Sequence, residues 1–136
     1  MTKKEESIVS GKRKTSIAKA RISPGNGKIT INNIPYANLH DFHRLSIEEP
    51  IRIAKIILKE INYDIHVKVA GGGRESQIEA ARLAIAKALV QKTKSEVLKR
   101  AFLKYDKHLL VADIRRKEAY KPDDSKARAK RQSSKR

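Results

Sequence analysis

Residues 63–92 read YDIHVKVAGGGRESQIEAARLAIAKALVQK and decide the fold, because they join a strand to a helix through three glycines. The first eight residues alternate: Tyr63, Ile65, Val67 and Val69 form an apolar face, and the residues between them are mostly polar. This period of two predicts a strand with one buried face. From about Glu75 to Lys92, apolar residues recur at helical spacing and many are alanines, which predicts a helix packed closely on a sheet.

The segment before it is rich in strand and turn signals. Residues 13–22 predict a strand with a charged outer face, and the Ser-Pro-Gly-Asn-Gly run at 23–27 has the residues that turns require. Residues 28–32 alternate cleanly, so we expect a hairpin between these two strands. Residues 34–36 add a short edge strand before a helical turn.

Two further helices complete the prediction. Ser46 to Glu49 has the spacing of a capping box and Pro50 suits a first turn, so a helix is expected at about 47–60. A third helix is expected at 95–105, anchored by Val97, Leu98, Ala101 and Phe102. The predicted order is strands, helix, strand, helix, helix and tail, without an internal repeat.

The charge balance indicates a polyanionic partner. The chain of 136 residues carries a formal net charge of +17, and residues 7–40 contain six Lys or Arg and no acid. The last 22 residues, 115–136, contain ten Lys or Arg and three acids, without any large aliphatic side chain. Such a segment cannot bury a core and is expected to fold only against a polyanion, most often nucleic acid.

Other classes are disfavoured by composition. The chain has no cysteine, so disulfides and thiolate metal sites are excluded. The N-terminal residues MTKKEESIVSGKRK have no apolar signal core, and no apolar run is long enough to span a membrane. Few aromatic residues are present, which favours contact through phosphates over base stacking or membrane insertion.

The motifs give no enzyme signature and require no cofactor. Gly71, Gly72 and Gly73 precede Arg74-Glu75-Ser76, whereas a nucleotide-binding loop ends in Gly-Lys-Ser or Gly-Lys-Thr. An RNA-backbone contact and a purely structural turn both remain open for this loop. His40 and His43 could meet on one helical turn, but no acid or cysteine pattern completes a metal site.

Three segments together resemble the small-subunit ribosomal protein nine family, and residues 109–113 resemble its archaeal and eukaryotic branch. The segments are GKRKTSIAKARISPGNGKITIN (11–32), VKVAGGGRESQIEAARLAIAKALV (67–90) and DIRRKEAYKPDDSKARAKRQSSKR (113–136). The resemblance implies an α+β two-layer fold: a mostly antiparallel four-stranded sheet, helices on one face, a left-handed β-α-β crossover and an extended basic C-terminal tail. We therefore expect a globular RNA-binding domain at 1–112 and a tail at 113–136.

By resemblance, the protein is a cytoplasmic constituent of the small ribosomal subunit, with neighbouring head proteins as partners and neither a membrane nor a small-molecule substrate. The tail tip would contact peptidyl-site tRNA through Ser134, Lys135 and Arg136. The residues expected to bind ribosomal RNA lie in the basic strand, the glycine loop and the tail: Lys12, Arg13, Lys14, Lys19, Arg21, Gly71, Gly72, Gly73, Arg74, Arg115, Arg116, Lys117, Lys126, Arg128, Lys130 and Arg131.

Two details depart from the family pattern. Ser133 stands where many members carry an aromatic residue or Lys, and Glu75 falls where the bacterial branch favours a small residue. Two alternatives stay open: an architectural protein that binds duplex DNA, and a small phosphotransferase whose glycine loop holds a nucleotide.

Overall fold

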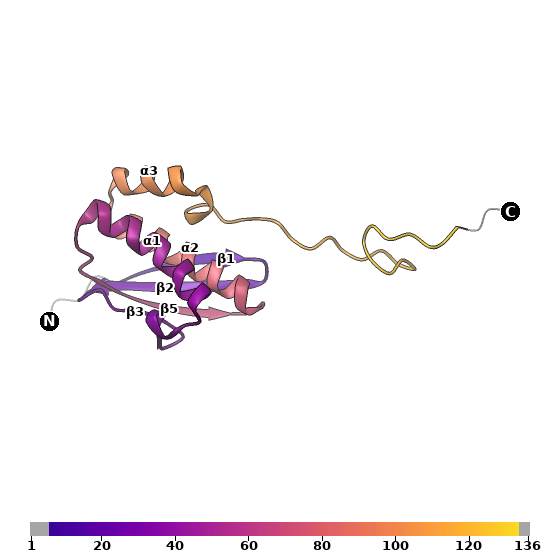
Figure 1. The fold of residues 1–136 in the computed structure, drawn as a ribbon, viewed down its shortest axis with the longest axis horizontal. Coiled ribbons are helices and arrows are strands. Elements are labelled where there is room, and N and C mark those ends of the chain that lie inside the picture. Colours follow the sequence, from indigo (N-terminus) through magenta and orange to yellow (C-terminus); the bar gives the residue numbers. More distant parts are fainter. Residues whose placement is uncertain (1–5, 134–136) are drawn as a thin grey trace.

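The computed structural model describes residues 6–133, and within them the strands form one mixed sheet with helices on one face (Figure 1). The sheet has five strands in the order β1 (Ser7–Arg13), β2 (Ser16–Pro24), β5 (Tyr63–Ala70), β3 (Ile29–Ile31) and β4 (Ile34–Pro35). Neighbouring strands are antiparallel except β3 and β5, which are parallel. The predicted α+β class is confirmed, and the mostly antiparallel sheet has one strand more than the expected four, because the basic N-terminal region supplies both β1 and β2.

The described residues form three helices, α1 (Asp41–Leu58), α2 (Arg74–Thr93) and α3 (Glu96–Tyr105), and the 3₁₀ turns η1 (Tyr36–Asn38) and η2 (Lys107–Leu109). Helix α2 packs on β1, β2 and β5, and α1 lies against α2 and α3. Five alanines of α2 are fully buried, which lets its backbone approach the sheet: Ala80, Ala81, Ala84, Ala86 and Ala88. In the described part of the chain, no helix has the length and hydropathy needed to cross a membrane.

The basic N-terminal region forms two strands, whereas one strand at 13–22 was expected. A tight turn at Lys14, whose φ is +51°, reverses the chain and pairs Arg13 with Ser16. Beyond the turn the alternation of β2 is as predicted, with Ile17, Lys19 and Arg21 outward and small side chains inward. Arg13 lies on β1 and is turned away from that outer face.

The expected hairpin between 13–22 and 28–32 is wrong, because β5 lies between β2 and β3. Strand β2 is already paired on both edges, with β1 and with β5. The loop between β2 and β3 is held by β5 instead: the Asp64 carboxylate accepts the backbone N–H groups of Asn26 and Lys28, both at 2.9 Å. These two bonds direct the chain alongside β5.

The first helix starts at Asp41, about six residues before the predicted start, so Ser46 and Pro50 lie inside it. Ser46 donates its hydroxyl to the carbonyl of Phe42, 2.9 Å away within the helix, and does not cap a terminus. Pro50 removes one helical hydrogen bond, a cost that burial of Ile47 and Ile51 offsets.

The other two helices match their predictions closely. Helix α2 occupies 74–93, and Ser95 caps α3 by accepting the backbone N–H of Leu98. Leu98 and Phe102 are fully buried as expected, but Val97 is 65% exposed and anchors nothing in the described domain. The short edge strand at Ile34–Pro35 and the following helical turn are also confirmed.

Candidate nucleic-acid interface

The sheet face opposite the helices is open and basic. The outward residues of β2 and β5 include Ile17, Lys19, Arg21, His66 and Lys68, which alternate with buried residues along each strand. Pairing sets Lys19 directly opposite Lys68 and Arg21 directly opposite His66. Sequence analysis flagged Lys19 and Arg21 but missed Lys68, because nothing in the local pattern reveals which strand lies beside β2.

Two acids lie at the margin of this face, and each has a partner. Glu6 lies 3.8 Å from the Arg21 guanidinium. The backbone N–H of Lys28 has the largest effect and lowers the pKa of Asp64; burial opposes it, and the N–H of Asn26 adds a smaller lowering, so the pKa stays below its usual range. Asp64 is therefore occupied with the loop. Neither Lys19 nor Lys68 has an ion-pair partner among residues 6–133.

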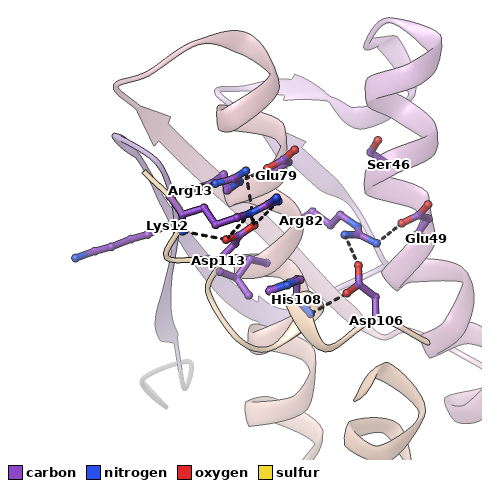
Figure 2. A pocket seen from close by; sticks show the side chains of 11 residues that line it. Lys12, Arg13, Ser46, Glu49, Glu79, Arg82, Asp106, His108 and Asp113 are labelled. Carbon is purple, nitrogen blue, oxygen red and sulfur yellow. Dashed lines mark hydrogen bonds and ion pairs between the residues drawn. The ribbon is translucent and has the colours of Figure 1, made fainter. Parts of the chain in front are cut away.

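Arg13 faces the other side, and acids surround it. Its guanidinium lies 2.5 Å from Glu79 of α2 and 3.6 Å from Asp113, and it donates to the carbonyl of Arg115 at 3.3 Å. Its side chain is only 13% exposed. The contacts tie the first residues of the C-terminal segment to the domain (Figure 2). Whether Arg13 also reaches RNA stays a prediction.

Asp113 is the acid at the root of this segment. Arg115 binds it through its guanidinium, at 2.8 and 3.0 Å, and through its backbone N–H at 3.0 Å. These side-chain hydrogen bonds, followed by the backbone one, hold the pKa of Asp113 well below its usual range. In turn, the hydrogen bonds to the Asp113 carboxylate raise the pKa of the Arg115 guanidinium. The predicted boundary at 112/113 therefore falls just before residues that contact the domain.

A second ion-pair group lies in the same cleft, which has a volume of about 350 Å³. Arg82 of α2 lies between Glu49 of α1 and Asp106, which follows α3, and it binds both carboxylates (Figure 2). Its Nε is buried without a hydrogen-bond partner in the described structure. The Asp106 carboxylate also accepts the backbone N–H of His108 at 2.9 Å. Arg13 and Arg82 thus each bind acids from separate parts of the fold.

The glycine loop has a packing role at two of its three positions. Gly71 and Gly72 adopt φ of +80° and +63°, which side chains disfavour. A Cβ on Gly71 would come within 2.6 Å of the Thr15 carbonyl, and one on Gly72 within 2.2 Å of the Ser16 hydroxyl. The Ser16 hydroxyl binds the Gly71 carbonyl and the Ser76 hydroxyl, each at 2.8 Å. The structural turn thus accounts for these two glycines.

Gly73 and Arg74 remain available for the predicted RNA contact. A Cβ on Gly73 would meet open space, and Arg74 is exposed at the start of α2. Beside them, Glu75 is occupied by His43, whose Nε2 lies 2.8 Å from the carboxylate. His40 and His43 pack edge to face at 5.9 Å, and residues 6–133 hold no cluster of ligands suited to a metal.

The C-terminal segment has no helix or strand between residue 110 and residue 133, and Figure 1 shows it leaving the domain. Arg116, Lys117, Lys126 and Lys130 are exposed. Three of the predicted RNA-binding residues here have local partners: Lys117 donates to the Tyr120 hydroxyl at 2.7 Å, Arg128 binds Glu118 at 2.8 Å and Arg131 binds Asp123 at 2.7 Å. Ser134, Lys135 and Arg136 lie outside the described residues.

These features define a class: a small, strongly basic α+β protein with exposed cations on a sheet face and along a C-terminal segment. Residues 11–136 match the family described as Ribosomal protein S9/S16, so the chain belongs to that family. The family consists of structural components of the ribosome and not of enzymes, in agreement with the sequence-based expectation.

Similar proteins from archaea carry the same assignment. One named "Small ribosomal subunit protein uS9", from Methanococcus vannielii, is 44% identical over 127 residues, which is 91% of this chain and 93% of the relative. Another with that name, from Methanococcus maripaludis strain C5, is 45% identical over the same shares of both chains. The predicted family and its archaeal-like branch are therefore confirmed.

Proposed function

We propose that this protein is a structural constituent of the small ribosomal subunit in the cytoplasm, where it binds ribosomal RNA in the head. Its relatives bear the name of that subunit. We further infer that the parallel connection from β3 to β5 through α1 is a left-handed crossover, as the resemblance implies. Neighbouring head proteins complete the proposed environment.

The observation that carries the proposal is the C-terminal segment. Residues 116–133 contain seven Lys or Arg against three acids, and Figure 1 shows them extended beyond the domain. A segment without an apolar core gains little by leaving water unless a polyanion receives its charge. Inside folded ribosomal RNA, each cation can neutralise a phosphate without reading the base sequence.

The tail tip is proposed to support peptidyl-site tRNA through Ser134, Lys135 and Arg136. A guanidinium can bind a phosphate with two hydrogen bonds, and contacts to phosphate accept any tRNA sequence. Ribosomes with a chain that lacks Lys135 and Arg136 should assemble normally but release peptidyl-site tRNA faster in a filter-binding assay. Equal retention by truncated and full-length protein would rule out this role.

Assembly is tested by sedimentation of a cell lysate on a sucrose gradient, followed by detection of the protein. Co-migration with small subunits and whole ribosomes after a high-salt wash is the expected result. Recovery in light fractions, or with chromosomal DNA, would overturn the proposal and favour the architectural DNA-binding alternative. ATP-dependent thermal stabilisation would instead favour the phosphotransferase, which family membership already disfavours.

The β1–β2 turn is tested with Lys12→Gln/Lys14→Gln, which leaves the ion-paired Arg13 in place. Both lysines are exposed. The log–log salt slope for binding a transcript of the head region of small-subunit RNA should flatten by about 1.4–1.8, since each phosphate contact contributes about 0.7–0.9. The matched control is Lys99→Gln/Lys104→Gln on α3, which removes the same charge elsewhere. Equal slopes would exclude the turn from the interface.

A further inference from the structure

The open face of β2 and β5 brings together cations from segments nearly fifty residues apart. Strand pairing orders this face in rows across the sheet: Arg21 beside His66, Lys19 beside Lys68, and Ile17 beside Ala70. Lys12 of β1 extends the last row, because it pairs with Ile17. Successive outward residues on a strand lie about 7 Å apart. The face therefore presents two rows of basic side chains, bordered on one side by the apolar residues Ile17 and Ala70.

Lys19 and Lys68 are a local cost to the fold. Residues directly opposite in antiparallel strands have Cβ atoms about 5 Å apart, and like charges there are destabilising. The packed side of the sheet avoids this cost, since it is built from apolar and small residues. A like-charged pair in the middle of an otherwise well-formed sheet is explained when a polyanion supplies the missing counter-charge.

The surroundings of the pair suit a sugar–phosphate backbone. Lys19 and Lys68 border an open groove of about 590 Å³, which Ile17, Ala70 and Asn33 also line. Ile17 is 43% exposed and gives the groove an apolar floor. The outward residues of β2 and β5 include no Phe, Tyr or Trp on which bases could stack. The positive charge of the groove disfavours a basic protein partner.

We propose that this groove is a distinct RNA-binding site, in which Lys19 and Lys68 together hold the backbone of ribosomal RNA on the open sheet face. The inference rests on the proposed function and adds Lys68 and the groove floor to the interface. Arg21 and His66 continue the contact along the next row. The RNA covers the sheet face and relieves the repulsion between the two lysines.

The test uses the full-length protein with Lys19→Gln/Lys68→Gln and the transcript of the small-subunit head region. Loss of two phosphate contacts should flatten the log–log salt slope by about 1.4–1.8. The control Lys99→Gln/Lys104→Gln, with both residues exposed on α3, should keep the wild-type slope. The sheet-face variant should melt at or above the wild-type temperature, because the substitution removes repulsion. This separates lost binding from misfolding.

Each outcome decides between defined alternatives. If the sheet-face variant and the α3 control give the same slope while removal of residues 116–136 flattens it, this site is disproved and the proposed function stands. If the slope on free RNA is unchanged but the variant dissociates from ribosomes at lower salt, the groove holds an acidic protein and the inference is wrong. If no basic variant changes the slope, the proposed function itself fails.

Discussion

The cleft beside α2 and the open face of the sheet are both rich in cations but surround them differently. In the cleft, Arg13 lies between Glu79 and Asp113, and Arg82 binds two further carboxylates from separate elements. On the sheet, Lys19 lies opposite another lysine. The cleft arginines bind acids from separate parts of the fold, whereas Lys19 and Lys68 have no ion-pair partner among residues 6–133. Lys12 and Arg13 both line the cleft, but only Arg13 binds acids; Lys12 has no ion-pair partner among residues 6–133.

Arg82→Met should produce the largest effect on stability. The substitution leaves the Glu49 and Asp106 carboxylates without their cation. It also removes the buried, unpaired Arg82 Nε, which offsets part of the lost stability. We expect the free energy of unfolding to fall by about 2 kcal/mol. Urea denaturation measures it, with Lys87→Met on the same helix as the control, expected within about 0.5 kcal/mol of wild type. If Arg82→Met lowered the free energy of unfolding by less than about 0.5 kcal/mol, the ion pairs of the cleft would be dispensable for stability.

Arg13→Gln and Lys12→Gln, at neighbouring positions, should separate an effect on stability from an effect on RNA binding. The Arg13 variant should lose about 1 kcal/mol of stability, since its side chain is largely buried between two acids. Trypsin should also cleave faster after Arg115, because the root of the tail is no longer held. Lys12→Gln should leave both readouts unchanged and flatten the RNA salt slope by about 0.8. If Lys12→Gln lowered stability and Arg13→Gln flattened only the salt slope, the structural role would belong to Lys12 and the RNA contact to Arg13.

Lys68→Glu should uncouple stability from binding. Replacing repulsion with attraction to Lys19 is expected to raise the free energy of unfolding by about 0.5 kcal/mol. RNA affinity should fall in the same variant, because a negative charge now faces the phosphates. Lys99→Glu on α3 carries the same charge change and should affect neither quantity as strongly. A destabilised Lys68→Glu variant would contradict the like-charge interpretation.

The smallest expected effect is that of Asp113→Asn on the loss of stability at acidic pH. The pKa of Asp113 is lowered in the fold by Arg115, so its contribution is complete above the unfolded-state pKa of about 3.9 and is lost as pH falls below it. Asp113→Asn should therefore weaken the dependence of the free energy of unfolding on pH as pH falls from about 5 toward the lowered pKa of the folded state. Asp123→Asn, whose ionic partner Arg131 also lies in the tail, is the control and should leave the curve unchanged.

Much of the fold follows from local pattern. The helix at 74–93, the strand at 63–70 and the helix at 96–105 each have signals within a few residues, and all three were expected close to these bounds. The helix at 41–58 starts earlier than expected because Pro50 resembles a first-turn residue, whereas in the fold Pro50 lies in the helix interior, buried together with Ile47 and Ile51. The hairpin was wrong because the nearest strand in sequence is not the nearest in space.

For the interface, the sequence by itself determined the charge, the family and the basic C-terminal segment, because composition and local motifs do not depend on folding. Tertiary structure decided which cations remain available. It paired Arg13 with acids from α2 and the tail root, and it placed Lys68 opposite Lys19. The physical reason is that electrostatic interactions depend on distances between segments far apart in the chain, which only strand order and helix packing fix.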